Sequence, residues 1–283
     1  MIQPTQPGRP QPSSPTFLTV WVFVLLVGAA CATSPTGRSQ ILLNSEAEMA
    51  EMGRLAFAEM QTKTPRSTNS GRTRYVRCVA DAITATLTPD ELRLLSVDRW
   101  EVELFEDPTA NAFALPGGKI GVHTGLLDVA TTQAQLAAVL GHEVGHVLAR
   151  HGNERVSQQM LAQSGLQALQ VMLEEDSPEK QQLYAALGAG VVQYGVLMPF
   201  GRQQESEADS IGLKLMASAG FDPRESVTLW RNMARASGGQ SPPEFLSTHP
   251  SDTTRISRLE AEMSEAIPIF EQARANGHHP NCR

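Results

Sequence analysis

The sequence predicts a mainly helical α+β fold with a small antiparallel sheet, and two observations support this prediction. Apolar residues recur at helical spacing along most of the chain, as at Leu136, Val139, Leu140 and Val144. One shorter stretch, Trp100–Phe105, instead alternates as W-E-V-E-L-F, which is typical of a strand. Hydrophobic residues make up 41% of the 283 residues, so the chain is long and apolar enough to form a packed core.

The charge balance and the motifs argue against two broad classes of protein. A net charge of −7 gives no support for a nucleic-acid partner. The sequence also lacks a Gly-rich phosphate-binding loop and a dinucleotide-binding fingerprint. We therefore expect no nucleic-acid partner and find no signal for a nucleotide cofactor.

Residues 1–30 are expected to be a signal peptide outside the folded domain. Residues 1–16 are rich in Pro, Gln and Ser, and Phe17–Ala30 is an unbroken apolar run that is short for a membrane span. The run ends in small residues followed by Cys31, a pattern that resembles a bacterial lipoprotein processing site. We therefore expect lipidation of Cys31, with simple cleavage or an uncleaved anchor helix as the alternatives.

Each of these three outcomes implies export of the protein. A lipid on Cys31 would attach the chain to a membrane. Ala32, directly after the cysteine, favours the outer membrane by analogy with lipoprotein sorting in enteric bacteria. The sequence therefore predicts a protein of the bacterial cell envelope at the periplasmic face of the outer membrane, with residues 31–45 as a tether.

The folded domain is expected over residues 46–270, and its first half contains both helices and strands. Two helices come first and three short strands follow, at residues 46–61, 73–87, 100–105, 111–115 and 119–123. The last two strands are joined by Pro116, Gly117 and Gly118, which are typical turn residues.

The second half is expected to be helical. Periodic segments bounded by Gly, Pro and polar residues predict helices at residues 132–150, 153–173, 181–198, 203–219, 223–236 and 251–266. We expect the Ala/Gly/Val-rich segment 181–198 to be a buried core helix, with a cover over a cleft or a contact with lipid as alternatives. Residues 271–283 are expected to be a polar tail.

The stretch His142-Glu143-Val144-Gly145-His146 lies within the helix expected at residues 132–150. Because the two histidines are four apart, both imidazoles leave the same face of a helix, one turn apart. That spacing lets both rings bind one zinc ion and sets Glu143 beside the metal, where it can take a proton from a water. The alternative is a helix with two surface histidines.

A hydrolytic zinc site needs a third protein ligand. The metzincin pattern is disfavoured, because Ala149 and Gly152 stand where it needs a glycine and a histidine. Glu205 and Asp209 are better candidates, since they are four apart on a predicted helix and share a face. One carboxylate can close the zinc site and the other can accept the second ring N–H of a ligand histidine, although a solvated acidic face is the alternative.

The HEVGH stretch followed by ESEAD at residues 205–209 resembles the gluzincin peptidases of the CaaX prenyl endopeptidase and HtpX type, most closely the periplasmic BepA- and LoiP-like lipoprotein peptidases. The stretches CATSPTGRSQILLNSEAE, NAFALPGGKIGVHTGLL and FLSTHPSDTTRI resemble the same family. The resemblance implies that Glu205 is the third zinc ligand and that Asp209 lies behind the ligands. It also implies that the strand at 111–115 presents its edge to the substrate, with an ordinary hairpin as the alternative.

The resemblance implies an exported zinc metalloendopeptidase that cleaves unfolded or misassembled envelope proteins, outer-membrane proteins among them. One zinc would be held by His142, His146 and Glu205, with Glu143 as the general base. One rival is a chaperone-like lipoprotein that binds client proteins and cleaves little. The other is a structural zinc protein, which the lack of a cysteine-rich ligand set disfavours.

The resemblance also places His249, in the segment Thr248-His249-Pro250, close to the zinc cleft. Its ring could donate a hydrogen bond to the oxyanion, or it could bind the zinc as a movable plug, which we favour. A histidine that only closes a loop is the alternative. His151, five residues past His146, is expected to be structural or capping, because it lies off the ligand face of the helix.

The chain has only three cysteines, Cys31, Cys78 and Cys282. If Cys31 carries lipid, the remaining even number permits a Cys78–Cys282 disulfide in an oxidising compartment. The sequence cannot place the two residues within bonding distance, so the free thiols remain an alternative.

Overall fold

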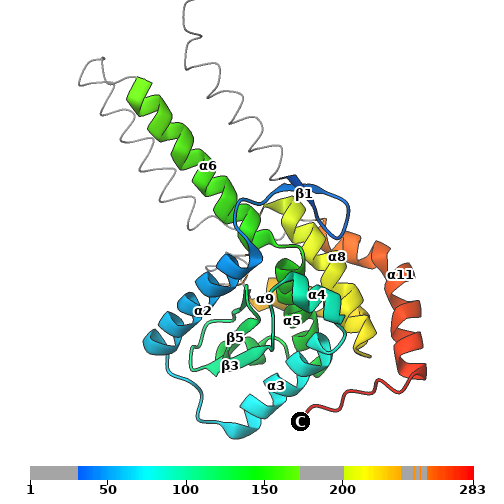
Figure 1. Ribbon diagram of the computed structural model, residues 1–283. Coiled ribbons are helices and arrows are strands. Elements are labelled where there is room, and N and C mark those ends of the chain that lie inside the picture. Colours follow the sequence, from blue (N-terminus) through cyan, green and yellow to red (C-terminus); the bar gives the residue numbers. More distant parts are fainter. Residues whose placement is uncertain (1–30, 173–200, 237–244, 246–248, 250–253) are drawn as a thin grey trace, which may run out of the picture.

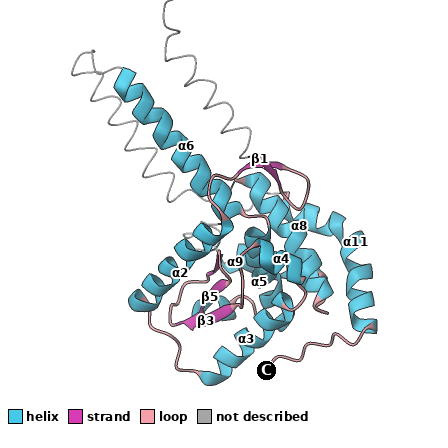
Figure 2. Ribbon diagram, in the orientation of Figure 1, coloured by secondary structure: helices cyan, strands magenta, loops and turns pink. Residues whose placement is uncertain are grey.

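Helices make up most of the computed structural model, and a small sheet packs against some of them at one side of the molecule (Figures 1 and 2). The structure describes residues 31–172, 201–236, 245, 249 and 254–283. Within these ranges the α-helices are α2 (Glu46–Lys63), α3 (Ser70–Thr84), α4 (Pro89–Leu94), α5 (Gln133–Leu148), α6 (His151–Met172), α8 (Arg202–Ser218), α9 (Arg224–Ala236) and α11 (Arg255–Ala275). A 3-10 helix, η1 (Thr124–Asp128), follows the sheet. The prediction of a mainly helical fold with a small sheet is confirmed.

The larger sheet has three strands in the order β3-β5-β4, formed by Glu101–Phe105, Lys119–His123 and Ala112–Leu115. Strands β4 and β5 form the predicted antiparallel hairpin. Its turn contains Gly117 and Gly118 at φ angles of 76° and 75°, which glycine adopts without steric cost. Strand β3 pairs with β5 in parallel, so antiparallel pairing holds for only one of the two strand pairs. Strand β4 lies at an edge of this sheet.

Except for α4, which the sequence did not predict, the described helices agree with the predicted ones within a few residues at most ends. Ser45, Asn69 and Thr132 each accept a hydrogen bond from a backbone N–H in the first turn of the helix that follows. Helix α11 differs most, because it continues through Pro268 and past the expected end at residue 266. The helix expected at 181–198 lies outside the described residues. Among the described helices, none has the length and hydropathy of a membrane span.

Helix α5 runs through the interior and packs closely on α8 (Figure 1). Every residue from 135 to 148 is buried. Glycines permit the close approach: a Cβ added to Gly212 of α8 would lie 2.6 Å from the backbone N of His142, and one added to Gly145 of α5 would lie 2.9 Å from the carbonyl oxygen of Ala208. The acidic side chains of α8 can therefore reach the histidines of α5.

Two terminal segments are attached to this helical core. The β-hairpin of β1 (Cys31–Thr33) and β2 (Ser39–Ile41) lies within the range expected as a tether and sits over the start of α6 and α8 (Figure 1, blue). At the other end, Cys282 forms a disulfide with Cys78 of α3. The disulfide that the cysteine count permits is therefore present, and it ties the polar tail to α3.

Candidate metal centre

Helix α5 places His142, Glu143 and His146 in the protein interior. Each of these residues is no more than 3% exposed. The Nε2 atoms of the two histidines lie 3.0 Å apart, because residues four apart leave a helix from the same face. The convergence of the two rings that the motif predicts is confirmed.

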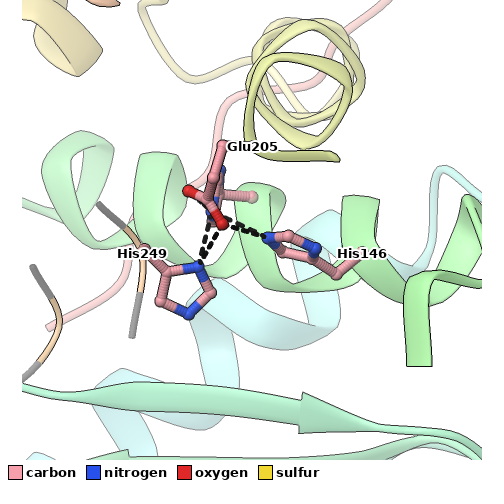
Figure 3. Close-up of side chains that lie close together, drawn as sticks. His146, Glu205 and His249 are labelled. Carbon is pink, nitrogen blue, oxygen red and sulfur yellow. Dashed lines mark hydrogen bonds and ion pairs between the residues drawn. The ribbon is translucent and has the colours of Figure 1, made fainter. Parts of the chain in front are cut away.

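Helix α8 supplies the third group, Glu205, whose carboxylate spans both histidines. Its Oε2 lies 3.4 Å from His142 Nε2, and its Oε1 lies 3.3 Å from His146 Nε2. His249 also approaches Glu205, with its Nδ1 3.0 Å from Glu205 Oε1 (Figure 3). The same Nδ1 lies 3.1 Å from His142 Nε2. One ligand atom from each of the four residues lies within 4.8 Å of the others.

The donor set fits zinc. Two imidazoles and one carboxylate are the protein ligands of many hydrolytic zinc sites, and all four converging side chains are buried. A cation among them would compensate the charge of the buried carboxylate. His142, His146 and Glu205 are therefore placed to hold one metal ion, consistent with a single zinc, and the predicted cofactor is confirmed at this level.

Burial and neighbouring charges shift the pKa values of the donors. Burial alone would raise the pKa of Glu205, but the facing His142 and the hydrogen bonds from the histidines hold it well below its usual range. Burial lowers the pKa of His142, yet Glu205 and Asp209 outweigh it and raise that pKa to about 9. Burial also lowers the pKa of His146 well below its ordinary value. Glu205 is thus ionised, and its negative charge favours a proton on His142. A metal cation bound between the two side chains would take the place of that proton.

Glu143 lies between the histidines and the edge strand β4. Its Oε2 accepts a hydrogen bond from the backbone N–H of Ala114 at 3.3 Å, and its Oε1 lies 3.4 Å from His249 Nε2. Burial raises the pKa of Glu143, and the nearby histidines oppose that rise only in part. A buried carboxyl group with a raised pKa is suited to take up and release a proton.

Asp209 lies behind His142, one helical turn after Glu205. Its Oδ1 is 2.9 Å from His142 Nδ1. Arg255, which is 1% exposed, donates to Asp209 Oδ1 at 2.5 Å and to Glu205 Oε2 at 3.2 Å. Its guanidinium lies 3.5 Å from the ring centroid of Trp230. The sequence did not predict the burial of Arg255 or its contact with Trp230. Nothing in the local pattern around Arg255 distinguishes a buried arginine from an exposed one.

His151 does not belong to the four converging donors, as its spacing predicts, but it contacts one of them. Its Nδ1 lies 2.8 Å from His146 Nδ1, and its Nε2 lies 3.1 Å from Glu207 Oε2. Glu207 also accepts hydrogen bonds from Thr36 at 2.6 Å and from Arg38 at 3.0 Å. Burial lowers the pKa of His151, whereas the hydrogen bonds hold the pKa of Glu207 below its usual range despite burial. No local sequence signal links these residues.

The fold and the buried HEVGH donor set define a metallopeptidase, and comparison with known proteins identifies the family. The model of Peptidase family M48 matches residues 71–263, and the chain belongs to this family. The predicted class of enzyme is therefore confirmed.

Individual proteins with similar sequences include metalloendopeptidases and one assembly-enhancing protease. The mitochondrial metalloendopeptidase OMA1 of Schizosaccharomyces pombe is 41% identical over 169 residues, 59% of this chain and 48% of that protein. The human OMA1 metalloendopeptidase is 28% identical over 259 residues, 88% of this chain and 49% of that protein. The beta-barrel assembly-enhancing protease of Escherichia coli is 30% identical over 174 residues, 60% of this chain and 36% of that protein. The chain thus spans about a third to a half of the length of these relatives.

These comparisons correct two expectations. The predicted location at the periplasmic face of the bacterial outer membrane is wrong, because relatives from fungi, plants and animals are mitochondrial proteins. An apolar run before small residues and a cysteine is too unspecific to assign a compartment. The predicted likeness to the CaaX prenyl endopeptidase and HtpX type, and most closely to the periplasmic lipoprotein peptidases, is not supported either. Several OMA1 proteins are more similar to this chain than the Escherichia coli relative is. The signal peptide, the lipid on Cys31 and the domain boundaries stay predictions.

Proposed function

We propose that this chain is a zinc-dependent endopeptidase that cleaves segments of unfolded or misassembled proteins, and so serves protein quality control. The observation that carries the proposal is the convergence of His142, His146 and Glu205, with Glu143 in contact with the edge strand β4. Relatives named as metalloendopeptidases and as an assembly-enhancing protease support a protein substrate.

The side chains around the donors have separate chemical roles in this proposal. A bound zinc supplies Lewis-acid activation of a water and of the substrate carbonyl. Glu143 takes the proton of the attacking water and later delivers it to the leaving amine, which its raised pKa favours. Asp209 accepts the Nδ1–H of His142 and so leaves the Nε2 lone pair of that ring facing Glu205 and His146.

The position of strand β4 at the edge of the sheet favours a substrate that binds in an extended conformation. Among the described strands, β4 pairs only with β5, so no described strand lies along its other edge. A segment added there would pass Ala114, whose backbone N–H contacts Glu143. Folded proteins rarely release a segment for such pairing, whereas unfolded or misassembled chains offer many. The geometry therefore favours non-native proteins as the substrate class.

We further propose that His249 gates the site. Its Nδ1 lies close enough to Glu205 and His142 to bind the same metal ion. A fourth protein ligand would occupy the coordination position that a catalytic zinc keeps for water or substrate. The rival role is donation to the oxyanion. If His249 is a gate, His249→Ala should cleave faster and retain zinc. If His249 is an oxyanion donor, the same change should slow turnover about 10²–10³-fold. Unchanged activity would contradict both roles.

The proposed activity is tested with Glu143→Gln, which keeps the size of the side chain and removes the base. The variant should bind zinc as the wild type does, and it should lose at least about 10²-fold in cleavage of an unfolded protein such as reduced, alkylated casein. A chelator should abolish cleavage by the wild type. If the wild type binds the unfolded protein but never cleaves it with zinc present, the protein is a client-binding module and the proposed activity is wrong.

A further inference from the structure

The two histidines of α5 are held by different partners behind the metal site. His142 Nδ1 meets the carboxylate of Asp209 directly at 2.9 Å. His146 Nδ1 instead meets a second imidazole, the Nδ1 of His151, at 2.8 Å. A ligand histidine needs a partner on its far nitrogen that fixes the ring and its tautomer, and an imidazole can fill that role only if its own tautomer is fixed.

A local turn brings His151 to this position. Helix α5 ends at Leu148 and α6 begins at His151. Between them, Arg150 adopts φ 55°, a left-handed conformation that ends α5 and turns the chain before α6 begins. His151, which is 0% exposed, is therefore directed back toward His146 although it lies off the ligand face of an uninterrupted helix.

The hydrogen-bond partners of Glu207 decide which ring nitrogens of His151 and His146 carry a hydrogen. The Glu207 carboxylate is the hydrogen-bond acceptor for Thr36 and Arg38, so it carries no proton to donate to His151. Nε2 of His151 must then be the N–H, and in a neutral ring its Nδ1 is the acceptor. That acceptor takes the Nδ1–H of His146 and leaves the Nε2 lone pair of His146 facing Glu205 and His142.

Glu207, the last residue in this series of hydrogen bonds, is held by the hairpin of β1 and β2. Arg38, in the turn between β1 and β2, donates through Nε to Glu207 and through its two terminal nitrogens to Glu154 at 2.6 and 2.7 Å. The side chains of Glu207 and Glu154 are only 3% and 5% exposed, so one guanidinium forms ion pairs with two buried carboxylates. Gln204 of α8 also donates to Glu154 at 2.7 Å.

We propose that His151 and Glu207 are positioning residues that fix the ring of His146 for the metal, and that Arg38 holds Glu207 in this role from the N-terminal hairpin. This inference rests on the proposed function, because it concerns how well the same site binds zinc. It adds a structural task for the hairpin at residues 31–41: the hairpin completes the support of a ligand that lies more than a hundred residues away in the sequence.

The test uses a matched pair of variants at one buried position. In His151→Asn, the side-chain oxygen takes the place of the ring Nδ1 and can still accept from His146. In His151→Leu, a side chain of similar size offers no acceptor. Zinc affinity is measured on the full chain by competition with a chelator, and thermal unfolding of the metal-free proteins shows whether either change disturbs the fold.

We expect His151→Leu to bind zinc about 10–100-fold more weakly and His151→Asn to recover most of the loss, at similar metal-free stability. Arg38→Leu should also weaken zinc binding, whereas Arg54→Leu should not, because Arg54 pairs with Glu51 on the exposed face of α2. Wild-type affinity in His151→Leu, or an equal loss in both His151 variants, would overturn the role of His151. Equal effects of the two arginine changes would overturn the role of Arg38. If the wild type itself binds no zinc, the proposed function fails instead.

Discussion

The support of His142 and the support of His146 differ in how much of the chain each one needs. Asp209, which contacts His142, is one turn from the ligand Glu205 on the same helix. His146 depends on His151 and Glu207, and Glu207 in turn on Arg38, which is 169 residues away in the sequence. The first support is local to a helix, whereas the second exists only when the hairpin, α6 and α8 are assembled. One ligand of the site is therefore more sensitive to distant changes than the other.

Structural changes in α8 and in the hairpin should affect the metal site differently. Helix α8 carries Glu205, Glu207 and Asp209, so a displacement of α8 affects a ligand and both supports together. A change in the hairpin at residues 31–41 affects only the support of His146.

Glu205→Ala should have the largest effect, because it removes a ligand that neither support can replace. Two ligands remain of the three that a hydrolytic zinc site uses, so the protein should be isolated without stoichiometric zinc. Metal analysis after dialysis checks this expectation, with Glu143→Gln as the control that should retain zinc. Full zinc occupancy in Glu205→Ala would remove Glu205 from the ligand set.

Much of the site could be predicted from the sequence where its geometry is local. His142, His146 and Glu143 follow from one helical motif, and the pairing of Glu205 with Asp209 follows from the same four-residue spacing. The start of α5 was predicted at Thr132, which is its N-cap. These features depend on contacts within one or two turns, which a pattern in the chain records directly.

The remaining features depend on contacts between distant segments. The buried position of Arg255 against Trp230 and Asp209 requires α9, α11 and α8 to pack together. The parallel pairing of β3 with β5 is decided by how the sheet folds, because the strands themselves carry the same alternation either way. The contact of His151 with His146 depends on a left-handed residue, Arg150, where no glycine signals a turn.

Gly212→Ala should disturb both supports at once. The added Cβ would lie under 3 Å from backbone atoms of Gly141 and His142, so α5 and α8 must separate. We expect a loss of about 1–3 kcal/mol in the free energy of unfolding, measured by urea denaturation, because overpacking of a close contact costs that much. Zinc affinity should fall as well, since all three acidic side chains of α8 move away from the histidines.

Gly165→Ala is the matched control for this change. Gly165 lies in α6 with nothing within 4 Å of an added Cβ. The substitution there should leave stability unchanged or raise it slightly, because alanine favours a helix over glycine. Equal stability of the two variants would mean that the glycine contact does not set the distance between α5 and α8.

The final prediction concerns the independence of the two supports, measured by zinc affinity in Asp209→Asn, His151→Leu and the double variant. Each single change should cost about 10–100-fold in affinity, or about 1.4–2.7 kcal/mol. Asp209 and His151 contact different rings and have no hydrogen-bond partner in common among the contacts described above. Their effects should therefore add to within about 0.5 kcal/mol. If the double variant is no worse than the weaker single one, the supports act as one unit. The distinction between a local support and a long-range support would then be wrong, because loss of either would already release both histidines.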